Sequence, residues 1–192
     1  MPKVVPEYKA QARARIVEAA RVVFQRKGFR SATMEDIAEE LGVSKGALYL
    51  YFRTKAQLLV QIQARTRADI LQKWEGLLEE GDIAEGIAHS LDGIFSGEVD
   101  PAIWHELVAE AAGDPEVRRA LELDRRADTK LMRQFLVKLQ TRGRIPPMKD
   151  PSGVTQVILI LLQGTALQIM FEGREGDSRR TLVRGIRLAL GL

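Results

Sequence analysis

The sequence contains no cysteine, and this absence excludes disulfide bonds, thiolate metal sites and cysteine nucleophiles. Histidine is nearly as scarce, because His89 and His105 are the two in the chain, too few to favour a zinc enzyme. The chain also lacks a GxSxG turn and a glycine-rich phosphate loop. Carboxylates at Glu106, Glu110 and Asp114 have the spacing of an ordinary solvated helix face. We therefore expect no enzyme, no metal site and no cofactor.

Signals for export or membrane insertion are weak. The N-terminus lacks the apolar core of a secretory signal. Segment 154–171 is 18 residues long and apolar, but Gln156, Gln163 and Gln168 interrupt it. Amide side chains are costly in hydrocarbon, so this pattern predicts a buried helix of a soluble protein rather than a membrane span. We expect a cytoplasmic protein with no membrane contact.

Positive charge is concentrated in the first third of the chain. The net charge is only +3. Residues 1–60 nevertheless hold 11 Lys and Arg against 6 Asp and Glu, whereas the remainder holds 18 against 20. This distribution indicates a polyanion contact confined to one end, although a solvated basic surface would have the same composition.

Alternation with a period of two is absent over any useful length, and helical spacing occurs almost everywhere. Asp-Pro pairs at 100–101, 114–115 and 150–151 each fit a helix start, with Asp as the N-cap and Pro as the first helical residue. Gly28 and Gly42 fit helix ends. The pattern predicts an all-α fold of about nine helices.

The first ~53 residues predict three short helices, the last two joined by a tight turn, which is a helix-turn-helix arrangement. On a helical wheel of the third helix, Leu48 and Phe52 form a narrow buried stripe. Tyr49 and Tyr51 flank that stripe on its two sides, so their rings can pack while their hydroxyls stay free for phosphate oxygens. Leu50 points directly away from the core.

The start of this third helix suits close approach to another surface. Gly46 and Ala47 are small, and Lys45 can reach outward as a hydrogen-bond donor. A helix lying in a DNA major groove needs small residues, donors and an apolar group for thymine methyls. The alternative is a satellite helix with aromatic padding and one exposed leucine, and the residues alone leave both interpretations open.

One set of residues in this region closely resembles the TetR/AcrR family of bacterial regulators. The set spans about residues 12–60 and matches in both spacing and residue type: Gly28, Phe29, Thr33, Met34, Glu35, Asp36, Ile37, Ala38, Leu41, Gly42, Val43, Ser44, Lys45, Gly46, Ala47, Leu48, Tyr49, Tyr51, Phe52, Lys55, Leu58 and Leu59. The rest of the chain matches only in length and helical character. The resemblance implies a DNA-binding domain at 1–53 and an effector-binding and dimerisation domain at 54–192.

The resemblance also implies roles for individual residues on double-stranded DNA. Thr33 and Lys55 would contact phosphates at the starts of the second and fourth helices, and Tyr49 would contact a phosphate or a base. The positions that would face bases are Ser44, Lys45, Gly46 and Ala47. The family often packs the Tyr51 position inward, and its Leu50 position varies.

The last two predicted helices, at about 151–174 and 178–191, are the candidates for a homodimer interface. The run at 157–162 is apolar all round, so the helix needs cover on more than one side. The candidate interface residues are Val157, Ile160, Leu161, Gly164, Gln168, Leu182, Ile186 and Leu190. Burial at the centre of one monomer is the alternative.

The sequence is less informative about an effector. The candidate pocket residues are Phe95, Trp104, His105, Leu107, Val108, Met132, Phe135, Leu136 and Gln163, although most such residues are plain core in proteins. Their character favours a small lipophilic effector. The predicted function is a repressor that binds a palindromic operator as a homodimer and is released by that effector. The alternative is a DNA-binding dimer controlled by a protein partner or by no ligand.

Overall fold

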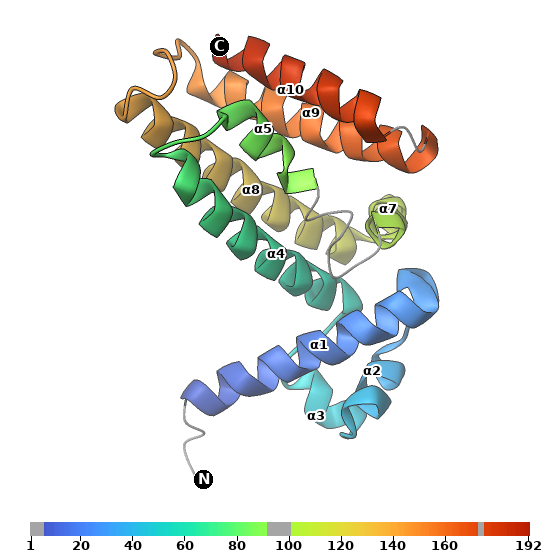
Figure 1. The fold of residues 1–192 in the computed structure, drawn as a ribbon. Helices are drawn as coiled ribbons and strands as arrows, with labels where there is room; N and C mark the ends of the chain where they lie inside the picture. Colours follow the sequence, from blue (N-terminus) through green and yellow to red (C-terminus); the bar gives the residue numbers. More distant parts are fainter. Residues whose placement is uncertain (1–5, 92–100, 173–174) are drawn as a thin grey trace. The chain divides into compact units, whose positions relative to one another are not determined.

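The computed structural model describes residues 6–91, 101–172 and 175–192 (Figure 1). Within these ranges every regular element is an α-helix, as the sequence predicts. The helices are α1 (Pro6–Ser31), α2 (Met34–Leu41), α3 (Lys45–Tyr49), α4 (Lys55–Leu77), α5 (Ile83–Ala88), α7 (Pro101–Glu110), α8 (Pro115–Thr141), α9 (Pro151–Glu172) and α10 (Glu175–Leu190).

The chain divides into two compact units. The first contains residues 1–65 and 98–122, and the second contains 66–97 and 123–192. Helices α4 and α8 therefore each begin in the first unit and continue into the second. This grouping places α7 with the N-terminal helices. The boundary at residues 53/54, between the predicted DNA-binding and effector domains, remains a prediction.

The first unit packs α1, α2, α3, α7 and the beginning of α4 around one apolar core. Its largest fully buried side chains include Phe24, Phe29, Phe52 and Leu107. Phe24 and Phe29 lie on either side of a kink at Gly28, where φ is 75° and ψ is 165°. Their rings are 5.4 Å apart and tilted by 57°. Because φ is positive, this position favours glycine, and the helix continues for only one further turn.

Local capping forms the helix-turn-helix segment. Thr33 caps α2 with a capping box, in which Thr33 and Asp36 each accept a hydrogen bond from the other's backbone N–H. Gly42 ends α2 in the left-handed conformation with φ of 72°. Ser44 then caps α3 through a hydrogen bond from the Ala47 N–H to its Oγ, 3.2 Å. These caps set the short turn between α2 and α3.

In the second unit, Figure 1 shows α9 and α10 side by side, and α5 packs against α10. The core also contains Trp74 of α4 stacked on Phe135 of α8, with ring centroids 4.8 Å apart. The indole N–H of Trp74 donates to the Ser90 hydroxyl at 3.1 Å, so the buried nitrogen is satisfied.

A buried charge cluster also joins α4 to α8 in this unit. Arg67 donates to the carboxylates of Asp124 and Asp128, and the Asp124 side chain is only 4% exposed. Burial raises the pKa of Asp124 above its usual range, the Asp128 carboxylate adds to the rise, and the Arg67 guanidinium opposes it. Removing one partner would leave the other charge buried and unpaired, which is strongly destabilising.

Helix α9 leaves much of its apolar surface uncovered by its own chain. Residues 151–171 have the length and composition of a membrane span, and little of this stretch is buried by its own chain. Val157, Ile160 and Phe171 are exposed, and Gly164 and Gln168 share this outer face. The prediction that α9 needs cover on more than one side agrees with this exposure.

The other predicted interface residues do not lie on that face. Leu182, Ile186 and Leu190 of α10 are buried within the unit, so other side chains of the same chain already cover them. Leu161 is half-buried, and its Cδ1 would lie 3.1 Å from a Cβ added at Gly185 of α10. A helical period places a residue on a face but does not say whether a neighbouring helix of the same chain already covers it.

Candidate nucleic-acid interface

The side chains of α3 and the following turn divide as the helical wheel predicts. Leu48 and Phe52 are buried in the core of the first unit, and Leu50 is 83% exposed. Tyr49 is exposed, whereas Tyr51 is half-buried and packs against the core. The buried pair anchors this short helix, so that its opposite face is held outward.

The outward face offers close approach. Ser44, Lys45 and Gly46 are exposed, and Ala47 is partly exposed. A Cβ added at Gly46 would meet no atom within 4 Å, so the surface there is open. The Ser44 hydroxyl is already used in capping the helix, which leaves Lys45 as the charged donor of this face.

Lys45 is held by two neighbours in the absence of DNA. Its ammonium forms an ion pair with Glu35 at the start of α2 and lies 5.8 Å from the centre of the Tyr49 ring. The side chains of Lys45 and Glu35 are both about half exposed. An ion pair with this exposure contributes little stability, so Lys45 can exchange Glu35 for a polar group on DNA at small cost.

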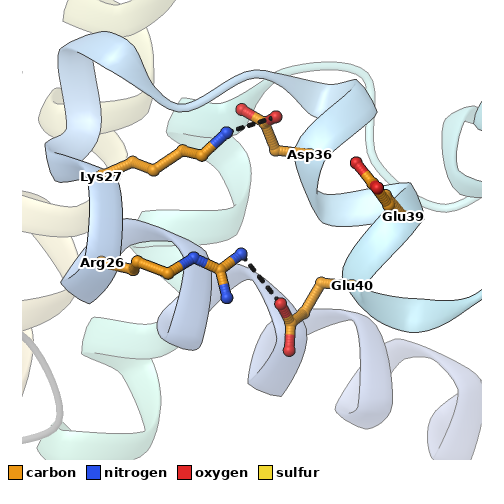
Figure 2. Close-up of a pocket in the computed structure, with 5 residues that line it drawn as sticks. All are labelled: Arg26, Lys27, Asp36, Glu39 and Glu40. Carbon is orange, nitrogen blue, oxygen red and sulfur yellow. Dashed lines mark hydrogen bonds and ion pairs between the residues drawn. The ribbon is translucent and has the colours of Figure 1, made fainter.

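Charged side chains of α1 and α2 face one another (Figure 2). Lys27 of α1 donates to Asp36 at 2.8 Å, and Arg26 pairs with Glu40 at 3.0 Å. Together with Glu39, these residues line an open hollow of about 370 Å³. Its charged lining does not suit a lipophilic effector. The two ion pairs hold α2 against α1, and Thr33, which caps α2, is exposed beside them.

The hydrogen bond from Lys27, with the bonds from Thr33, lowers the pKa of Asp36 from 3.8 to about 2. The folded protein therefore holds the ionised carboxyl more strongly than the unfolded chain does. Its stabilising effect is fully present above pH 3.8 and is lost as the pH falls through about 2. Asp36→Asn should destabilise the protein at neutral pH, and the difference from wild type should shrink across this window.

Urea unfolding of both proteins at a series of pH values measures this effect. Glu39→Gln is the matched control, because within the described residues Glu39 lines the same hollow without an ion pair. It should change stability little at any pH. A difference between Asp36→Asn and wild type that stays constant down to pH 2 would contradict the assignment.

Lys55, the predicted phosphate contact, is held by partners within its own chain. Its ammonium donates to the carbonyls of Phe29 and Arg30 at 2.8 and 3.1 Å and lies 3.9 Å from the Glu110 carboxylate. It also lies 4.6 Å from the centre of the Phe29 ring. The ammonium is thus occupied in capping the end of α1, and a phosphate would have to displace these partners.

The described residues of the predicted pocket divide between the two units. Leu107 belongs to the core of the first unit, and Met132, Phe135 and Leu136 belong to the core of the second. Val108 is exposed, His105 is half-buried, and Gln163 is exposed and accepts a hydrogen bond from Arg125 at 3.0 Å. Phe95 and the Trp104 side chain lie outside the described residues.

The chain is similar to known bacterial regulators. The family model of bacterial regulatory proteins of the tetR family matches residues 16–62, the region that contains α2, α3 and their supports. The chain is also 28% identical over 194 residues to the uncharacterised HTH-type transcriptional regulator YfiR of Bacillus subtilis, covering 98% of this chain and 95% of YfiR.

The N-terminal region of this chain is that of a TetR-family regulator.

Solved structures agree with the assignment at the level of the fold. Salmonella enterica GusR superimposes with a TM-score of 0.73 at 22% identity, over the full length of both chains. FadR from Bacillus subtilis, in complex with stearoyl-CoA, superimposes with a TM-score of 0.62 at 17% identity over 92% of this chain and 97% of FadR. The TetR-family resemblance read from residues 12–60 therefore extends, as a fold, through the helices that diverge in sequence.

Proposed function

We propose that this TetR-family regulator is a homodimeric repressor that binds a palindromic operator in the bacterial cytoplasm and is released by a small lipophilic effector. The observation that carries the DNA contact is the division of α3. Leu48 and Phe52 anchor it in the core while Lys45, Gly46 and Leu50 face outward on an open surface. A helix with a firm base and a small, donor-bearing outer face is suited to reading a major groove.

The proposal of a homodimer is based on the exposed apolar side chains on the outer face of α9. Val157, Ile160, Leu167 and Phe171 are exposed large apolar side chains on one helix, and Leu188 is a fifth on α10. Soluble monomers rarely leave such a contiguous apolar patch in water. A second copy presenting the same face by a two-fold rotation would cover it and would place two copies of α3 on one DNA duplex. The operator should then be an inverted repeat.

Two observations bear on the effector, and they favour different answers. FadR, which shares the fold, was solved with stearoyl-CoA, a molecule with a long acyl chain. This likeness favours a lipophilic ligand in the second unit. Burial of Met132, Phe135 and Leu136 in the packed core of that unit favours the alternative, a dimer that answers to a protein partner or to no ligand. A ligand co-purifying with the native dimer, identified by mass spectrometry, would decide between the two.

Release by an effector requires two states of the dimer with different effector affinities. Helix α4 begins next to the DNA-binding helices and ends in the second unit, so a change in its position would alter the spacing of the two α3 helices. Moving the population from 1:99 to 99:1 takes about 5.5 kcal/mol of difference in binding free energy between the states.

The absence of enzyme motifs and the regulator relatives support a protein without catalytic activity.

The DNA contact is tested by replacing Lys45. The lysine ammonium suits O6 and N7 of guanine, so Lys45→Ala should cost about 1–3 kcal/mol at the operator and relax the preference at one base pair in each half-site. Binding titrations on operator and scrambled duplexes at several salt concentrations measure both effects. The control is Lys73→Ala, which removes the same charge from an exposed position in the second unit.

Two results would count against the proposal. If Lys45→Ala weakens operator and scrambled duplexes equally, then Lys45 contacts phosphate and does not read a base. If the wild-type protein binds no DNA of any sequence at low salt, the proposed function is wrong as a whole.

A further inference from the structure

The end of α1 leaves backbone groups that the helix itself does not satisfy. The kink at Gly28 interrupts the helical conformation, and Phe29, Arg30 and Ser31 form one last turn. Backbone groups beside such a break need partners from elsewhere in the molecule. Here the partners come from two other helices, α7 and α4.

Helix α7 provides the acceptor. The Glu106 carboxylate accepts a hydrogen bond from the Arg30 N–H at 2.8 Å. A Cβ added at Gly28 would lie 3.3 Å from one oxygen of the same carboxylate and 3.5 Å from the other. Glu106 therefore lies directly over the kink, and the missing side chain at Gly28 gives it room. The positive φ favours glycine at this position, and a larger side chain would also press on the Glu106 carboxylate.

Helix α4 provides the donor. Lys55, its first residue, donates to the carbonyls of Phe29 and Arg30, the same turn that Glu106 holds through its N–H. Glu110, one turn after Glu106 on α7, lies 3.9 Å from the Lys55 ammonium. The last turn of α1 is thus held at its N–H by the Glu106 carboxylate and at two carbonyls by the Lys55 ammonium. The Glu110 carboxylate lies beside that ammonium.

The position of this cluster in the chain gives it a mechanical role. Helices α2 and α3 lie between residues 31 and 55, so Lys55 joins the two ends of the helix-turn-helix segment. Glu106 fixes that closed segment to α7. Helix α7 is itself anchored by Ile103 and Leu107, and Ala111 directly after it is buried in the same core with residues of α1. The chain then passes from α7 into α8, which continues into the second unit.

We propose that Glu106 and Lys55 form a latch that sets the position of the helix-turn-helix for operator binding without touching DNA. The latch is the point at which a movement of α7 would reach α3. Glu106 and Lys55 are thus positioning residues, and the inference rests on the proposed DNA-binding function. Neither role follows from short-range sequence patterns, because Glu106 bonds a residue 76 positions away.

The decisive variant is Glu106→Leu, which keeps the size of the side chain and removes the acceptor. We expect operator binding to weaken about tenfold, within the usual range of coupling between sites. Binding to random DNA at low salt should be unchanged, because it depends on phosphate charge rather than on helix position. Wild type should discriminate against operators with one base pair added between half-sites, and the variant should discriminate less. Glu106→Gln keeps an acceptor oxygen and should restore most of the operator affinity.

A second variant approaches the latch from the opposite side. Lys55→Met removes the donor to the Phe29 and Arg30 carbonyls and keeps most of the apolar stem. The latch predicts weaker operator binding with an unchanged salt slope, whereas a phosphate contact predicts a salt slope lower by about one unit per subunit. This variant decides the question if Glu106→Leu does not fold, and circular dichroism verifies folding of each protein.

The possible outcomes separate the latch from the proposed function. If wild type binds no DNA, the proposed function fails before the latch is tested. If wild type binds the operator and Glu106→Leu binds it equally, with the same spacing preference, the latch is wrong. Equal loss of operator and random DNA binding by a folded Glu106→Leu protein would also overturn it. A reduced salt slope in Lys55→Met would return Lys55 to the phosphate role.

Discussion

Replacing Ile160 by glutamate is expected to convert the dimer to a monomer at micromolar concentration and to abolish specific operator binding. Ile160 is 57% exposed on the outer face of α9, so the substitution should not disturb the core of its own unit. In a two-fold dimer each copy would add one charge to an apolar interface, where an unpaired charge is strongly unfavourable. A single helix-turn-helix reads only one half-site, which is too little for specific binding.

Light scattering and operator titration measure the two effects. The matched control is Val137→Glu, which places the same charge on an exposed apolar position of α8. It should leave the protein dimeric and able to bind the operator. A wild-type protein that runs as a monomer at micromolar concentration would contradict the dimer, and so would an Ile160→Glu protein that remains dimeric. The variant tests α9 at Ile160 rather than at Leu161, because Leu161 packs toward α10 of the same chain.

The second large effect is on stability. Phe135→Ala should lower the free energy of unfolding by about 3–5 kcal/mol, because it removes a buried ring and leaves a cavity beside Trp74. Urea denaturation followed by the fluorescence of the two tryptophans, Trp74 and Trp104, measures the loss. Val137→Ala, two residues further along α8 and exposed, should change stability by far less.

The same variant separates core from pocket at this position. The sequence allows Phe135 to line an effector cavity, and the structure stacks it on Trp74 at 4.8 Å. A large loss of stability agrees with a core role. A Phe135→Ala protein of wild-type stability that no longer retains a co-purifying ligand would instead place this ring in the effector site.

Much of the local structure could be predicted from the sequence because it depends on neighbours within one helical turn. Asp114 and Asp150 precede the first helical residues Pro115 and Pro151, and each carboxylate accepts hydrogen bonds from the N–H groups that follow. Thr33 and Asp36 form their capping box three residues apart. The helical wheel placed Leu48 inside correctly for the same reason.

The outward side chains of α3 could be predicted from the sequence. The contacts that hold the helix-turn-helix segment in place could not. Lys45, Gly46 and Leu50 lie on the outside of α3 by periodicity alone. The family resemblance implies a phosphate contact for Lys55. Glu106 and Glu110 were interpreted as an ordinary solvated helix face. Their partners at Phe29 and Arg30 lie on another helix, and one sequence does not show which distant segments meet.

The sequence also does not show which apolar side chains belong to the core and which to an interface, because this again depends on which distant segments meet. An apolar side chain is buried whether its neighbour is its own chain or a second copy, so composition cannot distinguish Ile186 from Ile160. The structure buries Ile186 and exposes Ile160. By itself the sequence determined the helical class, the caps, the helix-turn-helix and its outward face, since these depend on residues a few positions apart. The tertiary structure decided which apolar faces remain uncovered and which charged side chains hold the kink at Gly28. Both depend on contacts between helices that are far apart in the sequence, where close packing and the cost of burying polar groups select the partners.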